Sequence, residues 1–516
     1  MSIVIPPPGV IARITSIAGL LRHVTIATIA AQEFVARTYL SKQQGQQPVA
    51  SVATSASGSR GGGLSSEGGA IATKVKSQLE HQGGTPDFVT AADFAVQHIL
   101  FTSLCNPAAE AALQRRLSAF ATAAPEGAPL TPPRFRLIGE EDPTVVPPEV
   151  RDVVLSELLD RAEQSTAFAF LDRTVFQPLK APTTPKSSTV AATSVEEEDD
   201  DPTGKRVVDV FIDPIDGTNA MLSDDRKAPM LLVGVTINGV PAAGVVCRVF
   251  EAATATKDTS SAGVSAVQAI GRSGWPSLSV CLTGRFCVLW GEVLPPACNA
   301  LDTSRPAPAA PAPTLSSSLR FALSATNTSN NLRGFVAALR PFEAVKARGA
   351  GHKCMMVVDT AAADRRRTEP PAAAGTPLLD GGGGGERRGS GDEEADAFLS
   401  TGAKYWDICA PHAFLRHLGG AIACQNDATV EASAPLLGSR PPSKRFRELT
   451  YDVDEWTSRP PANSTSEQAP TVVVGSDVHV DATSFGRPFV IVAKSTAIRD
   501  AVTARLDASG TDLSKL

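Results

Sequence analysis

The stretch that decides the fold runs from Val207 to Thr218 and reads VVDVFIDPIDGT. Its first half is rich in valine, isoleucine and phenylalanine, which predicts a buried strand. We expect the strand to end at Asp213, because Pro214 has no backbone N–H to donate to a sheet. Asp213 and Asp216 then crowd the end of the strand. Crowded carboxylates repel one another unless a cation joins them, and their oxygen atoms are ligands that suit Mg²⁺.

Gly217 and Thr218 follow these two acids directly, at what the sequence predicts to be the start of a helix. The backbone N–H groups at a helix start have no partner within the helix and can hold an anion such as phosphate. The stretch therefore indicates metal-assisted chemistry on a phosphate ester.

The composition describes a globular protein with a large core. The chain has 516 residues, 42% hydrophobic and 20% charged, which is long enough for about two or three domains. A formal net charge of -6 argues against a general nucleic-acid binder. The eight cysteines show no zinc-type spacing and predict reduced thiols in an intracellular protein. No apolar run is long enough to span a bilayer, so we expect neither a membrane nor a nucleic acid as a partner.

The sequence ends in Ser514-Lys515-Leu516, the tripeptide that the peroxisomal import receptor binds. It predicts a peroxisome-type organelle (peroxisome or glycosome) as the location, with cytoplasm as the alternative, and the import receptor as a partner.

Other acidic residues lie at the predicted ends of separate elements. Asp93 follows Thr90 at a predicted helix start, where a carboxylate either caps the helix or belongs to a site. Glu140 and Glu141 follow a predicted strand that ends at Gly139, and they form either a solvated turn or part of a metal site.

Two further segments add candidates of the same kind. Asp407 is predicted to be the N-cap of a helix that ends at Gly419. The segment from Gly349 to Lys353 is a glycine-flanked basic turn, which either pairs with a phosphate or simply leads into a strand at 354–358. His412 and His417 are five positions apart, which does not fit a helical zinc pair, so we interpret both as structural.

The remaining pattern predicts a mixture of helices and strands interrupted by low-complexity insertions. We expect an amphipathic helix from Ile11 to Tyr39, a hairpin from 230 to 250 that turns at Asn238-Gly239, and a terminal helix after Ser495. Further strands are predicted at 285–291 and 320–324 and near Val472 and Phe489. Surface insertions are predicted near 51–63, 121–133, 182–205, 305–318, 361–394 and 441–467, and the acidic run 196–201 falls within one of them.

Taken together, three elements resemble the lithium-sensitive, magnesium-dependent phosphomonoesterases of the inositol monophosphatase superfamily. They are Gly139-Glu140-Glu141, Asp213-Pro-Ile-Asp216-Gly217-Thr218 and Trp406-Asp407. Within that superfamily the finer resemblance is to the inositol polyphosphate 1-phosphatases, and it is carried by 349–353, 232–246 and 406–420. The resemblance covers most of 11–506.

This resemblance implies an α/β fold, an αβαβα sandwich of the inositol monophosphatase and fructose-1,6-bisphosphatase type. It implies an N-terminal half, 11–300, with most of the metal ligands, and a C-terminal half, 319–506, with Asp407 and the substrate contacts. It also implies two or three Mg²⁺ per site and inhibition by lithium. The first Mg²⁺ would be held by Glu140, Asp213 and the carbonyl of Ile215; the second by Asp213, Asp216 and Asp407; and Glu141 would be a further ligand.

The resemblance also implies roles for residues that hold no metal. Asp93 would bind Thr218 and orient the attacking water, and the amides of Gly217 and Thr218 would receive the phosphate. Three residues would face the rest of the substrate: Gly349, Ala350 and Lys353. Phosphoryl transfer depends mostly on positioning and electrostatic stabilisation, so it needs no cysteine or histidine nucleophile.

The resemblance implies removal of the 1-phosphate from a small inositol polyphosphate such as inositol 1,4-bisphosphate. The alternatives are a 3'(2'),5'-bisphosphate nucleotidase, an inositol monophosphatase, and a non-catalytic binding protein on the same fold.

Overall fold

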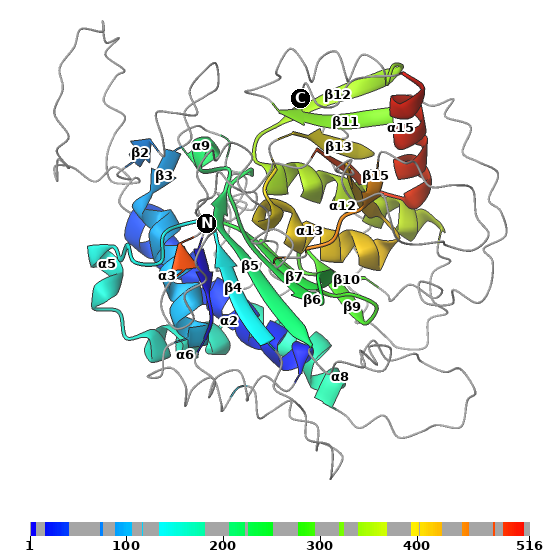
Figure 1. Ribbon diagram of the computed structural model, residues 1–516. Coiled ribbons are helices and arrows are strands. Elements are labelled where there is room, and N and C mark those ends of the chain that lie inside the picture. Colours follow the sequence, from blue (N-terminus) through cyan, green and yellow to red (C-terminus); the bar gives the residue numbers. More distant parts are fainter. Residues whose placement is uncertain are drawn as a thin grey trace, which may run out of the picture.

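The computed structural model consists of five alternating layers of helices and sheets (Figure 1). Helices cover the outer face of a nine-stranded sheet, two long helices lie between this sheet and a six-stranded one, and a last helix covers the second sheet. This is the layered α/β fold that we predicted. The structure describes residues 2–6, 16–40, 73–75, 88–105, 116, 134–180, 206–221, 225, 227–250, 277–294, 319–324, 339–368, 394–401, 403–425, 446–451, 453, 478–479 and 489–509.

The nine-stranded sheet has the order β10-β9-β8-β7-β6-β5-β4-β1-β16. Two neighbouring strands inside it, β4 and β5, run parallel, and a buried ion pair between Arg136 and Asp209 links them at directly opposite positions. The carboxyl ends of both strands therefore meet at one edge of the sheet. The strands are β1 (Ser2–Val4), β4 (Arg134–Gly139), β5 (Val207–Asp216), β6 (Met230–Ile237), β7 (Val240–Arg248), β8 (Leu278–Leu282), β9 (Phe286–Leu289), β10 (Glu292–Leu294) and β16 (Val478–His479).

The predicted hairpin is confirmed as β6 and β7. Asn238 and Gly239 form its turn with φ angles of 49° and 77°, the left-handed conformations that such a two-residue turn requires. The strand predicted at 285–291 is β9, and it joins the same sheet.

The predicted end of β5 at Asp213 is wrong, because the strand continues to Asp216. Asp213 lies opposite Leu232 and Asp216 lies opposite Met230, so three steps along β5 correspond to two along β6. This extra residue is a β-bulge, an arrangement that tolerates Pro214 inside a strand.

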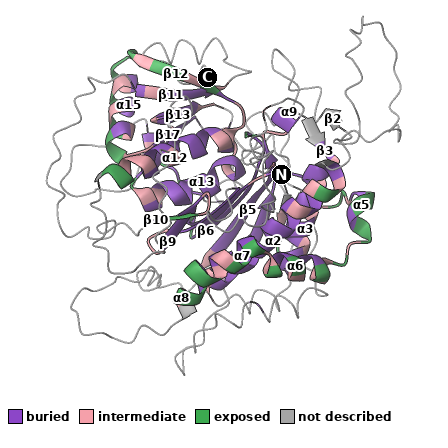
Figure 2. Cartoon of the chain, turned by 180° about the vertical axis from the view of Figure 1, so that it is seen from behind, coloured by how far each residue is buried: buried purple, intermediate pink, exposed green. Residues whose placement is uncertain are grey.

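The first helical layer contains α2 (Ile17–Val35), α3 (Ala91–Cys105) and α6 (Leu155–Gln164). The predicted amphipathic helix from Ile11 is corrected in two respects. It begins at Ile17, where Ser16 Oγ accepts a hydrogen bond from Gly19 N, and it is buried on nearly every side, since it packs on β6–β8 and beneath α3 and α6 (Figure 2). The smaller elements of this layer are η1 (Ala36–Leu40), α5 (Pro148–Arg151), α7 (Thr166–Leu171), η4 (Asp172–Phe176) and α8 (Gln177–Lys180).

The middle layer consists of α12 (Ala350–Thr368) and α13 (Tyr405–Leu418). The strand considered at 354–358 is corrected here, because α12 runs through it. The same helix continues to Thr368, into the insertion predicted at 361–394, and 369–393 lie outside the described residues. α13 packs on β5–β8 and also contacts β14, so this layer lies against both sheets. α13 packs closely on β6 and β7 at two glycines, Gly234 and Gly244, which have no side chain to keep the helix away. A Cβ on Gly234 would lie 2.7 Å from Ala410 N, and one on Gly244 would lie 2.6 Å from Ala410 O.

The six-stranded sheet has the order β12-β11-β13-β17-β14-β15, and α15 (Thr496–Ala508) covers its outer face. α15 begins after Ser495, as predicted, and β11 is the strand predicted at 320–324. The insertion predicted near 441–467 is described only at 446–451 and 453, where it contains β15. The strands are β11 (Leu319–Ser324), β12 (Phe342–Ala347), β13 (Ala397–Ser400), β14 (Ala421–Gln425), β15 (Phe446–Glu448) and β17 (Val490–Ala493).

Three short elements lie near the carboxyl ends of β4 and β5: β2 (Thr73–Val75), β3 (Phe88–Thr90) and α9 (Thr218–Met221). The predicted insertions at 51–63, 121–133, 182–205 and 305–318 lie outside the described residues, as do Val472 and the terminal Ser514–Leu516. Among the helices of the described ranges, none has the length and apolar character needed to cross a membrane.

Candidate metal centre

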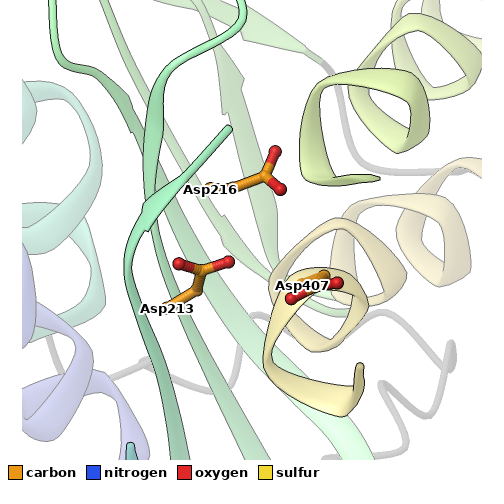
Figure 3. Close-up of side chains that lie close together, drawn as sticks. All are labelled: Asp213, Asp216 and Asp407. Atoms are coloured by element: carbon orange, nitrogen blue, oxygen red, sulfur yellow. The ribbon is translucent and has the colours of Figure 1, made fainter. Parts of the chain in front are cut away.

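Three buried carboxylates lie together at the carboxyl end of β5 (Figure 3). Asp213 and Asp216 come from β5, and Asp407 comes from the first turn of α13. One oxygen of each lies within 4.8 Å of the others, and the residues are 1%, 7% and 9% exposed. The structure thus brings together three of the predicted metal ligands.

The bulge in β5 explains how two acids three positions apart share one face of the sheet. In a regular strand, side chains alternate, so positions i and i+3 point to opposite faces. Here Asp213 and Asp216 oppose Leu232 and Met230, which are two apart and pack in the core beneath α12 and α13. Ile215 instead packs in the core on the other face. The extra residue therefore turns Asp216 toward Asp407.

Asp216 is fixed by the N-terminus of α12. Its Oδ1 accepts a hydrogen bond from Ala350 N at 2.9 Å, and its Oδ2 accepts one from His352 N at 3.1 Å. Gly349 precedes the helix with φ of 70°, and a Cβ at this position would lie 2.5 Å from Asp216 Oδ2. A glycine at 349 thus allows both the turn and the close approach of the carboxylate to the helix.

Asp407 lies within the first turn of α13 and is not its N-cap, which corrects the prediction. Lys404 is the N-cap, and its backbone N–H donates to Asp407 Oδ2 at 2.8 Å. The carboxylate therefore both supports the helix start and lies beside the two acids of β5.

The electrostatics of this group favour a bound cation. Burial raises the pKa of Asp216 to about 6; Lys353 opposes this shift and Glu140 adds to it. Burial also raises the pKa of Asp407 to about 7, and the nearby Asp216 and Glu140 carboxylates raise it further. A divalent cation among these oxygens would offset both the burial and the repulsion, so the donor set fits Mg²⁺.

Glu140 and Glu141 lie at the end of β4, beside Asp213, but they do not belong to the converging group of the described residues. Lys404 Nζ forms an ion pair with Glu140 Oε1 at 3.0 Å. The backbone of Glu141 is held by Gln97 of α3, which donates to its carbonyl at 2.6 Å and accepts from its N–H at 2.8 Å.

Asp93 and Thr218 form a hydrogen-bonded pair beyond the carboxyl end of β5. Thr218 Oγ1 lies 3.0 Å from Asp93 Oδ1 and 2.9 Å from the carbonyl oxygen of Ile215, and its single hydrogen can be donated to either. The other oxygen of Asp93 accepts from both Thr90 N and Thr90 Oγ1. Asp93 therefore supports the start of α3 and holds Thr218 at the same time.

The predicted substrate-facing residues lie around the start of α12. Gly217, with φ of 78°, precedes α9, and a Cβ there would lie 3.5 Å from Gly349 Cα. Lys353 is buried, and its ammonium lies 5.0 Å from the ring centre of Phe398. Burial lowers the pKa of Lys353, and the nearby Asp216 acts in the opposite direction.

Two residues were missed as site residues, Lys404 and Gln97. Lys404 directly precedes the Tyr-Trp-Asp segment, and its charge was the only available signal. His412 and His417 are buried and lie outside the converging group; His412 Nδ1 is 3.2 Å from the hydroxyl of Tyr451.

Comparison with known proteins gives one curated relative and a set of solved structures. No protein-family model matches the sequence. The chain is 22% identical over 215 residues to 3'(2'),5'-bisphosphate nucleotidase 1 of Dictyostelium discoideum, a match that covers 41% of this chain and 50% of the relative. The matched part thus spans half the length of that protein.

The solved structures that match include two SuhB proteins. The extragenic suppressor protein SuhB from Bartonella henselae has a TM-score of 0.38 at 10% identity, covering 94% of this chain and 98% of that one. SuhB from Mycobacterium tuberculosis has a TM-score of 0.30 at 14% identity, covering 59% and 73%.

Proposed function

We propose that the chain is a magnesium-dependent phosphomonoesterase of the inositol monophosphatase superfamily. The observation that carries this proposal is the convergence of three buried carboxylates from β5 and α13 beside the Asp93–Thr218 pair. The sequence similarity to a bisphosphate nucleotidase supports the same class of reaction.

Asp213, Asp216 and Asp407 would hold one Mg²⁺. Glu140, Asp213 and the carbonyl of Ile215 would hold another, with Glu141 as a further ligand. Bound Mg²⁺ lowers the pKa of a coordinated water molecule and stabilises the negative charge on the leaving oxygen.

The residues of the chain position the water and accept its proton. Thr218 Oγ1 donates toward Asp93 Oδ1, so its lone pairs are available to a water proton. As that proton moves to Thr218 Oγ1, the proton of Thr218 moves to Asp93 Oδ1. Thr90 holds the other Asp93 oxygen and keeps the carboxylate oriented.

The phosphate would be bound by the amides of Gly217 and Thr218. Gly349 and Ala350 would form the wall facing the rest of the substrate, because they lie beside Asp216 at the start of α12. Lys353, one turn along the helix, would add positive charge to this wall.

The substrate in this proposal is an inositol polyphosphate such as inositol 1,4-bisphosphate, which loses its 1-phosphate. It rests on the sequence of 349–353, 232–246 and 406–420. A 3'(2'),5'-bisphosphate nucleotidase is the second candidate, and the similarity to the Dictyostelium protein favours it. An inositol monophosphatase or a non-catalytic binding protein would use the same fold.

One experiment separates these candidates. Phosphate release with Mg²⁺ is measured from inositol 1,4-bisphosphate, adenosine 3',5'-bisphosphate and inositol 1-phosphate side by side, with and without lithium. We expect the highest kcat/KM for the inositol bisphosphate and inhibition by lithium. Preference for the nucleotide would replace the substrate assignment, and no turnover of any of the three would favour the binding protein.

We also propose that the C-terminal Ser514-Lys515-Leu516 directs the protein to a peroxisome-type organelle through its import receptor. Deleting these three residues should move a fluorescently tagged chain from organelles to the cytoplasm. An unchanged distribution would contradict the proposal.

A further inference from the structure

Lys404 places a positive charge at the edge of the metal centre. It is the N-cap of α13, three positions before Asp407, and its Nζ lies 3.0 Å from Glu140 Oε1. The same ammonium lies 5.4 Å from the ring centre of Trp406. The Lys404 and Glu140 side chains are 26% and 13% exposed, so solvent screens this pair only in part.

Glu140 is held next to Asp213 by the pairing of two parallel strands. Gly139 lies opposite Ile212, and Glu140 N donates to the carbonyl of Ile212 at 3.3 Å. Neighbouring strands are about 4.8 Å apart, so the next residues, Glu140 and Asp213, start from adjacent positions.

Lys404 is close to the converging carboxylates as well, since its backbone N–H donates to Asp407 Oδ2 at 2.8 Å. An ammonium that stabilises these carboxylates repels a second cation that binds them, because both interact with the same negative charge.

From this geometry we infer that Lys404 is a positioning residue that competes with Mg²⁺ for Glu140 and thereby weakens cation binding at the centre. The inference rests on the proposed function. It divides the predicted ligands into a converging group, formed by Asp213, Asp216 and Asp407, and Glu140, whose Oε1 is paired with Lys404.

The test is direct titration with Mg²⁺, followed by calorimetry, which needs no turnover. We expect Lys404→Met to lower the Kd for Mg²⁺ about tenfold, because it removes a unit charge next to Glu140. Lys404→Arg keeps the charge and should bind Mg²⁺ like the wild type. The hydrogen bond from residue 404 to Asp407 comes from the backbone, so all side chains at this position retain it.

Lys494→Met serves as the matched control. Lys494 is also a partly buried lysine that is paired with carboxylates, Asp364 at 2.6 Å and Asp396 at 2.7 Å, but it lies outside the centre. This variant should leave the Kd for Mg²⁺ unchanged.

A second comparison tests whether the effect acts through Glu140. In a Glu140→Gln background, Lys404→Met should change the Kd much less than it does in the wild type. Equal or weaker Mg²⁺ binding by Lys404→Met would overturn the competition. If neither the wild type nor Lys404→Met binds Mg²⁺, the proposed metal centre itself is wrong, which is a different and recognisable outcome.

Discussion

Asp213 illustrates how a single residue can favour cation binding and oppose stability. It is almost fully buried beside two other carboxylates, which repel it unless a cation is present. The same burial strengthens its interaction with a bound ion, because water no longer screens the charge. Burial of this carboxylate therefore lowers stability when no cation is bound and strengthens the binding of a cation.

We therefore predict that Asp213→Asn abolishes phosphatase activity, by about 10³-fold or more, without unfolding the protein. Without Mg²⁺ the variant should be at least as stable as the wild type, since one repelling charge is gone. Phosphate release and thermal unfolding with and without Mg²⁺ check both parts. The rise in Tm that Mg²⁺ gives the wild type should be lost, and retained activity would contradict the metal assignment.

Thr218 is expected to act through its hydroxyl group. Thr218→Val keeps the shape of the side chain but removes the hydrogen bond to Asp93, so kcat should fall about 10²- to 10³-fold with a smaller change in KM. Thr218→Ser should recover most of the rate. A valine variant with wild-type kcat would show that the hydroxyl takes no part in activating water.

The sequence identified the converging acids because each lies at the end of a recognisable element. It could not identify the partners of Glu140 and Glu141. Lys404 is 264 positions from Glu140, and Gln97 is 44 positions from Glu141. Such pairings depend on how the layers pack, and no local pattern encodes them.

At the scale of elements, α13 positions Asp407 by packing closely on two strands. Gly234 and Gly244 make this possible, because a Cβ on either would approach the backbone of Ala410. Asp407 lies on the same helix, three residues before that contact.

We predict that Gly244→Ala pushes α13 away from the sheet. It should destabilise the protein by about 1–3 kcal/mol and raise the Mg²⁺ concentration needed for half-maximal activity. Denaturant unfolding and a Mg²⁺ titration measure the two effects. Gly419→Ala, at the far end of α13, adds strain at φ of 87° with nothing within 4 Å, so it should reduce stability without changing the Mg²⁺ requirement.

Elements with strong local signals were predicted well, and the errors have physical causes. The Asn238-Gly239 hairpin was predicted correctly because both turn residues favour positive φ. The end of β5 was misplaced because a bulge lets a strand continue through Pro214. The helix at 354–358 was confused with a strand, since a short apolar run fits either element when both of its faces are buried.

At the scale of the molecule, three histidines lie neutral in its layers. Burial lowers the pKa of His23 in α2 and His412 in α13 to about 3, and that of His417 to about 4. Above pH about 6.5 the histidines are neutral in both the folded and the unfolded chain. Below it the unfolded chain binds protons that the folded chain does not bind until about pH 3 to 4, so stability falls as the pH falls through this window.

We predict that His412→Asn reduces this acid sensitivity. Between pH 6 and 4.5 the free energy of unfolding should fall less steeply than in the wild type, by up to about 1.4 kcal/mol per pH unit. Denaturant unfolding across this range gives the slope, and the comparison cancels the effects of carboxylates that both proteins share. An identical slope would mean that His412 does not remain neutral in the folded protein.

The layered arrangement was predictable only through the resemblance to a known family. Local patterns gave strands and helices but not their order in space. The pairing of β1 with both β4 and β16, which lie far apart in the sequence, is an example. This pairing forms only when segments from both ends of the chain come together in the folded protein.

The bulge in β5 makes the backbone path between Asp213 and Asp216 as important as the two acids themselves. If the strand ran regularly over these three steps, alternation would turn the second acid into the opposite core, even though both carboxylates remained. Point substitutions of Pro214 or Ile215 that keep the bulge leave both acids on one face. Over evolution the two middle residues should therefore vary only as far as the bulge is kept.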